Sequence, residues 1–232
     1  MSLNQNILEQ AEKLSEASVN YVETQDLDAV NTLTDNMSSV VVETSALYLM
    51  IKNMRQIVKN DGKRQAIKVH ELFSRCLSDF FTNGEARIYE DGNSGFIVLF
   101  DPKTTDTNKA VKYGLKLTHL FSKDLAPLAE KFNNISFGIG IDHGRVMGVN
   151  IGHPVWFGTC IEKAKKISEE CLKPCYLGIS GRVHSQLGDD LQTVTRHILG
   201  IPKKENMWIK STYQFENERK HLYQTYHSLE NE

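Results

Sequence analysis

The sequence is poor in cysteine and proline and has almost no excess of charge. Four of its 232 residues are cysteines, five are prolines, and the formal net charge is −2. A nearly neutral chain is not expected to coat nucleic acid or an anionic membrane. No apolar run approaches the roughly 18–20 residues of a transmembrane helix, and the polar, acidic start is not a signal peptide. These absences predict a cytoplasmic protein with no nucleic-acid partner and no membrane span.

The cysteines do not form the pattern of a metal site or a disulfide framework. Only Cys171 and Cys175, in CLKPC, are close together, and no second pair stands at zinc-ligand spacing. In a chain without an export signal we expect reduced thiols. The remaining composition, 40% hydrophobic and 24% charged residues, is that of an ordinary globular protein with a full core.

Short β-branched runs alternate with amphipathic segments along the chain. The runs predict five strands, at 38–43, 86–90, 96–100, 135–141 and 175–180. Helical spacing of apolar residues predicts helices at 3–34, 46–59, 65–81 and 159–171. We also expect RVMGVNIG to be the hairpin partner of 135–141, MWIKSTYQF to be a strand and ENERKHLYQTYHSLE to be a helix.

This order of elements predicts an α+β protein with an antiparallel-rich sheet flanked by helices. We divide the chain into a helical extension at 1–36, the main domain at 37–200, and a strand and helix segment at 201–232 that packs on the same domain. The sequence contains no internal repeat and no low-complexity linker.

The stretch ARIYEDGNSGFIVLF, 86–100, is the most informative part of the chain. Asp-Gly between two apolar runs is a strong hairpin signal, and aspartate before glycine suits a turn for backbone reasons alone. The turn also holds two adjacent acids, Glu90 and Asp91, and a basic residue, Arg87, four positions before Asp91. The stretch is therefore either an ordinary hairpin or a hairpin that carries a metal ligand.

The order of strands and helices over about 38–187 resembles the catalytic domain of class III nucleotidyl cyclases, a ferredoxin-like or palm-type fold. That family has an aspartate at the end of its first strand, a Lys-x-x-Gly-Asp hairpin turn, a Gly-Ile-x-x-Gly strand and a helix with Val-Asn-x-Ala-x-Arg. The corresponding stretches here are SSVVVETSALY, RIYEDG, FGIGIDHGRVMGVNIG and FGTCIEKAKKI. Glu43 and Asp91 then stand at the two aspartates, Arg87 at the lysine, Glu162 at the asparagine and Lys166 at the arginine.

The resemblance implies a reaction and its cofactors. A cyclase converts a nucleoside triphosphate to a 3′,5′-cyclic nucleotide and pyrophosphate, by phosphoryl transfer that needs positioning and charge neutralisation. Glu43 and Asp91 would hold two Mg²⁺ or Mn²⁺ ions, and Lys166 would neutralise charge on the phosphates. Arg145 would contact phosphate, and the shared sites of the family imply a homodimer.

Within the family, the chain is similar to pyrimidine cyclases of bacterial phage defence. Arg87 would bind the base through its fork of donors, and Tyr48 would shorten the pocket against a purine. UTP or CTP is therefore expected before ATP, in a signalling and antiviral role.

Two alternatives remain open at this point. Counting back from FIVLF puts Ser94 at the metal position and Glu90 at the lysine position, which would make the site inactive. The substitutions at Glu43, Glu162 and Lys166 also favour a cyclase-fold pseudoenzyme that binds a nucleotide or a protein partner.

Overall fold

The computed structural model describes residues 20–33, 38–92, 95–125, 135–171, 173, 176–198 and 201–229. The strands are β1 (Asn20–Glu23), β2 (Ser38–Ile51), β3 (Ala86–Glu90), β4 (Gly95–Phe100), β5 (Phe137–Asn150), β6 (Pro154–Phe157), β7 (Leu177–Ser180), β8 (Thr193–Ile198), β9 (Ile201–Asn206), β10 (Ile209–Phe215) and β11 (Glu218–Thr225). The helices are η1 (Leu27–Thr32), α2 (Met54–Asp61), α3 (Lys63–Phe80), α4 (Thr107–His119), η2 (Leu120–Asp124), α6 (Thr159–Glu170), α7 (Gly181–Ser185) and α8 (Asp189–Gln192).

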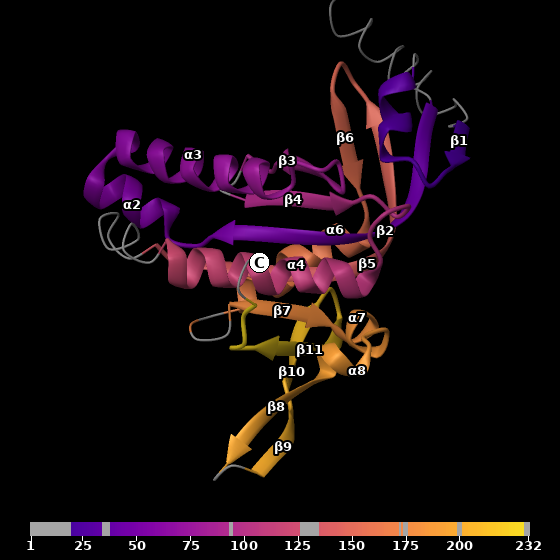
Figure 1. The fold of residues 1–232 in the computed structure, drawn as a ribbon. Helices are drawn as coiled ribbons and strands as arrows, with labels where there is room; N and C mark the ends of the chain where they lie inside the picture. The colour runs from indigo at the N-terminus through magenta and orange to yellow at the C-terminus, as the bar shows by residue number, and fades with distance from the viewer. Residues whose placement is uncertain are drawn as a thin grey trace, which may run out of the picture.

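One large sheet organises the molecule, with the strand order β10-β11-β7-β5-β2-β4-β3. Most neighbours are antiparallel; β5 and β7 are parallel, and so are β1 and β2. The separate β8–β9 hairpin projects away from the sheet (Figure 1). The predicted α+β class with an antiparallel-rich sheet is confirmed.

The two faces of the central strand β2 pack against different helices. Leu47, Leu49 and Ile51 share a core cluster with residues of α2, α3 and α4. Val40 and Val42 belong to a second cluster that contains Ile161 of α6. Because side chains alternate along a strand, β2 is the middle layer between α6 on one side and α3 and α4 on the other.

Glycines in β5 explain how closely α6 approaches the sheet. An added Cβ at Gly140 would lie 2.0 Å from the carbonyl oxygen of Ala164, and one at Gly138 would lie 2.2 Å from that of Ser168. Any side chain at these positions would push the helix off the sheet. The alternation of glycine and bulk in FGIGI therefore reflects helix packing on one face and core packing on the other.

Several predicted elements agree with the structure. The strands expected at 86–90, 96–100 and 175–180 appear as β3, β4 and β7, and the helices at 65–81 and 159–171 appear as α3 and α6. MWIKSTYQF contains β10. β10 and β11 join the main sheet. The division of the chain into segments at 1–36, 37–200 and 201–232 stays a prediction.

Four predictions of secondary structure are wrong. Residues 46–51 continue β2, and the helix begins only at Met54, because this buried run pairs with strands on both sides. β5 runs through 137–150 without a turn, and the strand that follows it and pairs with it antiparallel is β6. Residues 218–225 form β11, whose Leu222 packs in a small cluster with Tyr213. Of the expected N-terminal helix, 20–33 is a strand and a short 3-10 helix, and 1–19 lies outside the described residues.

No helix in the described part of the chain is long and apolar enough to cross a membrane. The described cysteines Cys76 and Cys160 are free thiols, and Cys175 lies outside the described residues.

Candidate functional site

A cavity of about 620 Å³ opens between the β3–β4 hairpin, β6 and the first turns of α6. We call it the hairpin cavity. Its lining consists of Tyr48, Ile88, Tyr89, Glu90, Asp91, Ile97, residues 153–157, Ile161, Glu162 and Lys165. The volume is in the range of small-molecule sites, which are typically 300–1,000 Å³.

Asp91 is the polar centre of the hairpin cavity. Its carboxylate accepts a hydrogen bond from the hydroxyl of Tyr48, and the ammonium of Lys165 lies 2.7 Å from its Oδ2. The same ammonium lies 5.5 Å from the centre of the Tyr48 ring. The Lys165 and Asp91 side chains are each 27% exposed, so this ion pair is only partly screened by water.

The hairpin itself positions these groups. The amide N–H of Asp91 donates to the carbonyl oxygen of Gly95, at 3.0 Å, and closes the turn. Gly95 has no side chain where Tyr48 crosses it: an added Cβ would lie 2.1 Å from the tyrosine hydroxyl oxygen. The glycine at the start of β4 therefore allows the phenol of the central strand to reach the turn.

Burial raises the pKa of Tyr48, and the hydrogen bond to Asp91 raises it further. An elevated pKa keeps the phenol protonated at neutral pH, so Tyr48 acts as a donor to the carboxylate.

Aromatic rings form the apolar wall of the hairpin cavity. The ring centres of Tyr89 and Trp156 are 6.4 Å apart, and Trp156 is buried. Trp156 packs over Gly148, where an added Cβ would lie 2.7 Å from the indole ring. An aromatic wall beside a charged polar centre suits a ligand with a flat ring and an ionic group.

Glu43 and Asp91, the predicted metal ligands, do not meet. Glu43 lies opposite Arg145 in the β2–β5 register, and its carboxylate accepts a hydrogen bond of 2.8 Å from Arg182. Tyr48, which holds Asp91, is five residues further along the strand, about 16 Å away, and on the other face. Glu43 thus lies within β2 beside Arg182, and Asp91 lies in the β3–β4 turn beside Tyr48 and Lys165. The shared divalent ion stays a prediction that this arrangement does not support.

The strand residue beside the hairpin turn is Met50. It pairs with Gly95, the first residue of β4, in the β2–β4 register. Ser94, the alternative metal position, lies outside the described residues. A thioether beside the turn offers no hard oxygen ligand, which Mg²⁺ prefers.

The residues of this region therefore do not fit the divalent ions that the cyclase fold implies. No group of three or more acids, histidines or cysteines with metal-site geometry occurs in the described ranges. The one carboxylate at the centre of the hairpin cavity is already neutralised by Lys165. We derive no metal-dependent step for this arrangement.

The other predicted site residues lie apart from the hairpin cavity. Arg87 donates to Asp28 through Nε, at 2.8 Å, and is turned toward η1. Lys166 forms exposed ion pairs with Glu169 and Glu170 on α6, at 2.9 and 3.5 Å. Their catalytic and binding roles stay untested, and neither lines the cavity.

Arg145 is also outside the hairpin cavity. It lies in β5 opposite Glu43, where it forms an exposed ion pair with Glu23. Of the six predicted site residues, only Tyr48 and Asp91 line the hairpin cavity, whereas Glu43 and Arg145 are cross-strand neighbours outside it.

Lys165 and Trp156 belong to the hairpin cavity but were not predicted. Lys165 is one of three lysines in EKAKK, and helical periodicity alone does not show which of them faces the sheet. Trp156 is one of only two tryptophans and stands just before an expected helix. This position was the sequence feature that could have marked it as a site residue.

No protein-family profile matches the chain, and neither does any curated protein sequence. Solved structures do. The guanylyl cyclase Cya2 superposes with a TM-score of 0.64 at 16% identity, over 82% of this chain and 94% of that one. The adenylyl cyclase CyaB from P. aeruginosa gives 0.61 at 12% identity, over 81% and 95%. The chain has the class III nucleotidyl cyclase fold.

A third similar structure is a class III adenylyl cyclase-like ATP-binding protein from Pseudomonas aeruginosa. It gives a TM-score of 0.60 at 14% identity, over 81% of this chain and 43% of that one. At these identities the comparisons establish the fold, and the activity has to be argued from the hairpin cavity.

Proposed function

We propose that the protein binds a nucleoside triphosphate in the hairpin cavity, as a homodimer, and that it is a nucleotide-binding member of the cyclase fold. The observation that carries this proposal is the arrangement of Tyr48, Asp91 and Lys165 at one end of an aromatic-walled cavity. The fold supports it, since the similar structures include guanylyl and adenylyl cyclases and an ATP-binding protein.

The wall and the polar centre suit different parts of a nucleotide. A base stacks on aromatic rings at a gain of about 1–3 kcal/mol, and Trp156 and Tyr89 offer such rings. Lys165 is the cation nearest the polar centre and would turn from Asp91 toward a phosphate. Asp91 would lose Lys165 as a partner but would keep the hydrogen bond from Tyr48, so its carboxylate would still be hydrogen-bonded.

We further propose that pyrimidine bases are preferred, so that UTP or CTP binds before ATP. Tyr48 supports this preference, because it lines the hairpin cavity and its phenol would shorten the space left for a base. Arg87 no longer contributes to the argument, since its guanidinium is engaged with Asp28. A role in antiviral signalling stays a prediction from the resemblance.

Turnover to a 3′,5′-cyclic nucleotide is the second candidate. The presence of Asp91 at the hairpin turn of a cyclase fold favours it. The distance between Glu43 and Asp91, and the pairing of each with a cation, favour binding without turnover.

One experiment separates the two candidates. Titrate the purified chain with each of the four nucleoside triphosphates in a calorimeter, after its dimeric state has been verified, and analyse the same samples with Mn²⁺ by mass spectrometry. Binding of a pyrimidine triphosphate without cyclic product supports the first candidate, and cyclic product supports the second. Absence of binding by all four would exclude both.

A further inference from the structure

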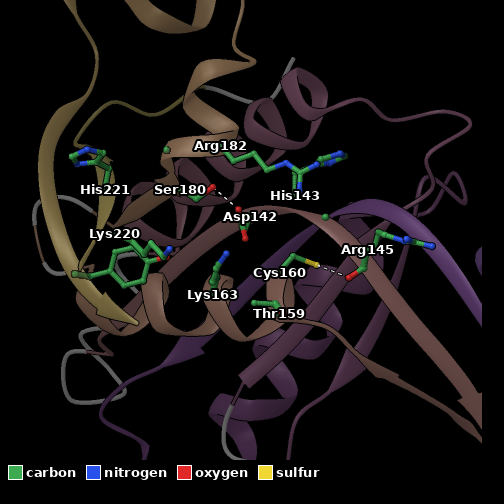
Figure 2. Close-up of a pocket in the computed structure, with 13 residues that line it drawn as sticks. Asp142, His143, Arg145, Thr159, Cys160, Lys163, Ser180, Arg182, Lys220 and His221 are labelled. Carbon is green, nitrogen blue, oxygen red and sulfur yellow. Dashed lines mark hydrogen bonds between the residues drawn. The ribbon is translucent and has the colours of Figure 1, made fainter. Parts of the chain in front are cut away.

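A second cavity, of about 510 Å³, is lined by residues of β7, β10 and β11, whereas the hairpin cavity is lined by residues of β3, β4 and β6. We call it the basic cavity. Side chains from four separate segments enclose it: β5, the first turns of α6, the β7–α7 junction, and the β10–β11 hairpin (Figure 2). Residues from four segments of the chain thus converge on one hollow.

The basic cavity has a marked excess of cations. Its lining contains four basic residues, namely Arg145, Lys163, Arg182 and Lys220, and two histidines. Asp142 is the only carboxyl group in the lining. This carboxyl is buried, at 3% exposure, and accepts a hydrogen bond from the hydroxyl of Ser180.

Lys163 distinguishes this cluster from a set of surface ion pairs. It forms no ion pair with any residue in the described part of the chain; its ammonium lies 5.6 Å from the centre of the Phe215 ring. Figure 2 shows the Lys163 side chain extending toward Asp142. A half-buried ammonium facing a hollow, with an aromatic ring beside it, is poised to bind an anion.

The remaining cations are held only by exposed acids. Arg182 pairs with Glu43 at 2.8 Å, and these side chains are 54% and 55% exposed. Lys220 pairs with Glu218, which is 68% exposed. Exposed pairs of this kind contribute about 0–1 kcal/mol each, so a multivalent anion in the cavity can replace them at little cost.

We infer that the basic cavity is a binding site for a small phosphate-bearing anion, held chiefly by Lys163 with Arg182 and Lys220. Phosphate groups offer several acceptor oxygens to converging lysine and arginine donors. Ser180 and Asp142 form the floor of the site, where the Ser180 hydroxyl also caps α7 by accepting from the Val183 amide at 3.2 Å. This site is separate from the proposed nucleotide site, with which it shares no lining residue.

The test is a calorimetric titration of the full chain at low ionic strength with sodium pyrophosphate, with UMP and with uridine. We expect pyrophosphate or UMP to bind, and whichever binds more tightly identifies the source as a free anion or a nucleotide. Lys163→Ala should weaken that binding at least tenfold, and Lys163→Arg should retain it. Uridine has no phosphate, so its titration should give the same heat with the original chain and with Lys163→Ala.

Two matched variants test whether the anion binds at Lys163 in particular. Lys112→Ala removes a cation of α4 that is paired with Asp190 and lies outside this cavity, so it should leave the affinity unchanged. Lys165→Ala instead removes the cation of the hairpin cavity. Equal affinity in the original chain and in Lys163→Ala would overturn the inference, as would the absence of binding. A loss confined to Lys165→Ala would assign the anion to the hairpin cavity and would overturn it too.

Discussion

The hydroxyl of Tyr48 donates a hydrogen bond to the carboxylate of Asp91, and so joins the central strand to the turn of the β3–β4 hairpin. The contact spans 43 residues of sequence and orders a turn that would otherwise be held by its backbone alone. The arrangement of the hairpin cavity depends on this bond.

Tyr48→Phe should lower the free energy of unfolding by about 1–2 kcal/mol, because a buried donor to a charged acceptor is lost while the ring remains. Urea unfolding measures this change. Tyr21→Phe is the matched control, since Tyr21 is 65% exposed and its loss of a hydroxyl should have no effect. Equal stability of the two variants would mean that the bond does not contribute.

Lys165→Met should destabilise the chain more than Lys166→Met. Lys165 faces a partly buried carboxylate, which would lose its cation, whereas the partners of Lys166 are exposed acids. We expect a loss of roughly 1–2 kcal/mol for the first variant and under about 0.5 kcal/mol for the second. Asp91→Asn added to Lys165→Met should recover part of the loss. A double mutant no more stable than Lys165→Met would contradict this account of the pair.

Gly140→Ala should destabilise the protein by about 1–3 kcal/mol, since the methyl group would press on the α6 backbone at Ala164. Gly181→Ala is the comparison. There the nearest atom to an added Cβ is Cβ of His221, at 3.5 Å, an ordinary contact. Thermal unfolding of both variants checks the prediction, and a similar melting temperature for the two would show that α6 shifts without cost.

Asp142 should make the free energy of unfolding depend on pH. Burial raises its pKa above the usual value, although Ser180 and nearby cations lower it in part. An acid with a raised folded-state pKa binds more protons when folded, so its contribution to stability is present below the unfolded pKa of 3.8 and is lost as pH rises through the folded pKa. Asp142→Asn, which keeps an acceptor for Ser180, should therefore flatten the fall in stability from about pH 4 to neutrality. Urea unfolding of both proteins at several pH values measures this. The same change of stability with pH in Asp142→Asn and in the original chain would contradict the prediction.

Secondary structure could be predicted from the sequence where a local pattern had only one structural outcome. The β3–β4 hairpin follows from Asp-Gly between two apolar runs, and α3 and α6 follow from their amphipathic spacing. In contrast, ALYLMI in β2 is apolar at every position, and periodicity does not distinguish a buried strand from a buried helix in such a run. Pairing with β4 and β5 decides it.

The candidate site was harder to predict because it depends on register. Asp91 and Tyr48 were identified from the sequence, but the partner of Asp91 was not. Glu43 and Met50 are both in β2, and the pairing of Met50 with Gly95 shows which of them lies beside the turn. Lys165 was missed because its orientation depends on how α6 packs over the β5 glycines.

The most direct test of nucleotide binding in the hairpin cavity uses its tryptophan. The chain has two tryptophans, Trp156 in the cavity wall and Trp208, whose Nε1 donates to the Leu191 carbonyl oxygen. In Trp208→Phe all indole fluorescence comes from Trp156. We predict that UTP or CTP quenches this fluorescence saturably, and that Lys165→Ala in the same background weakens the binding severalfold. Fluorescence that does not change with any nucleoside triphosphate, while Trp208→Phe remains folded by circular dichroism, would contradict the account.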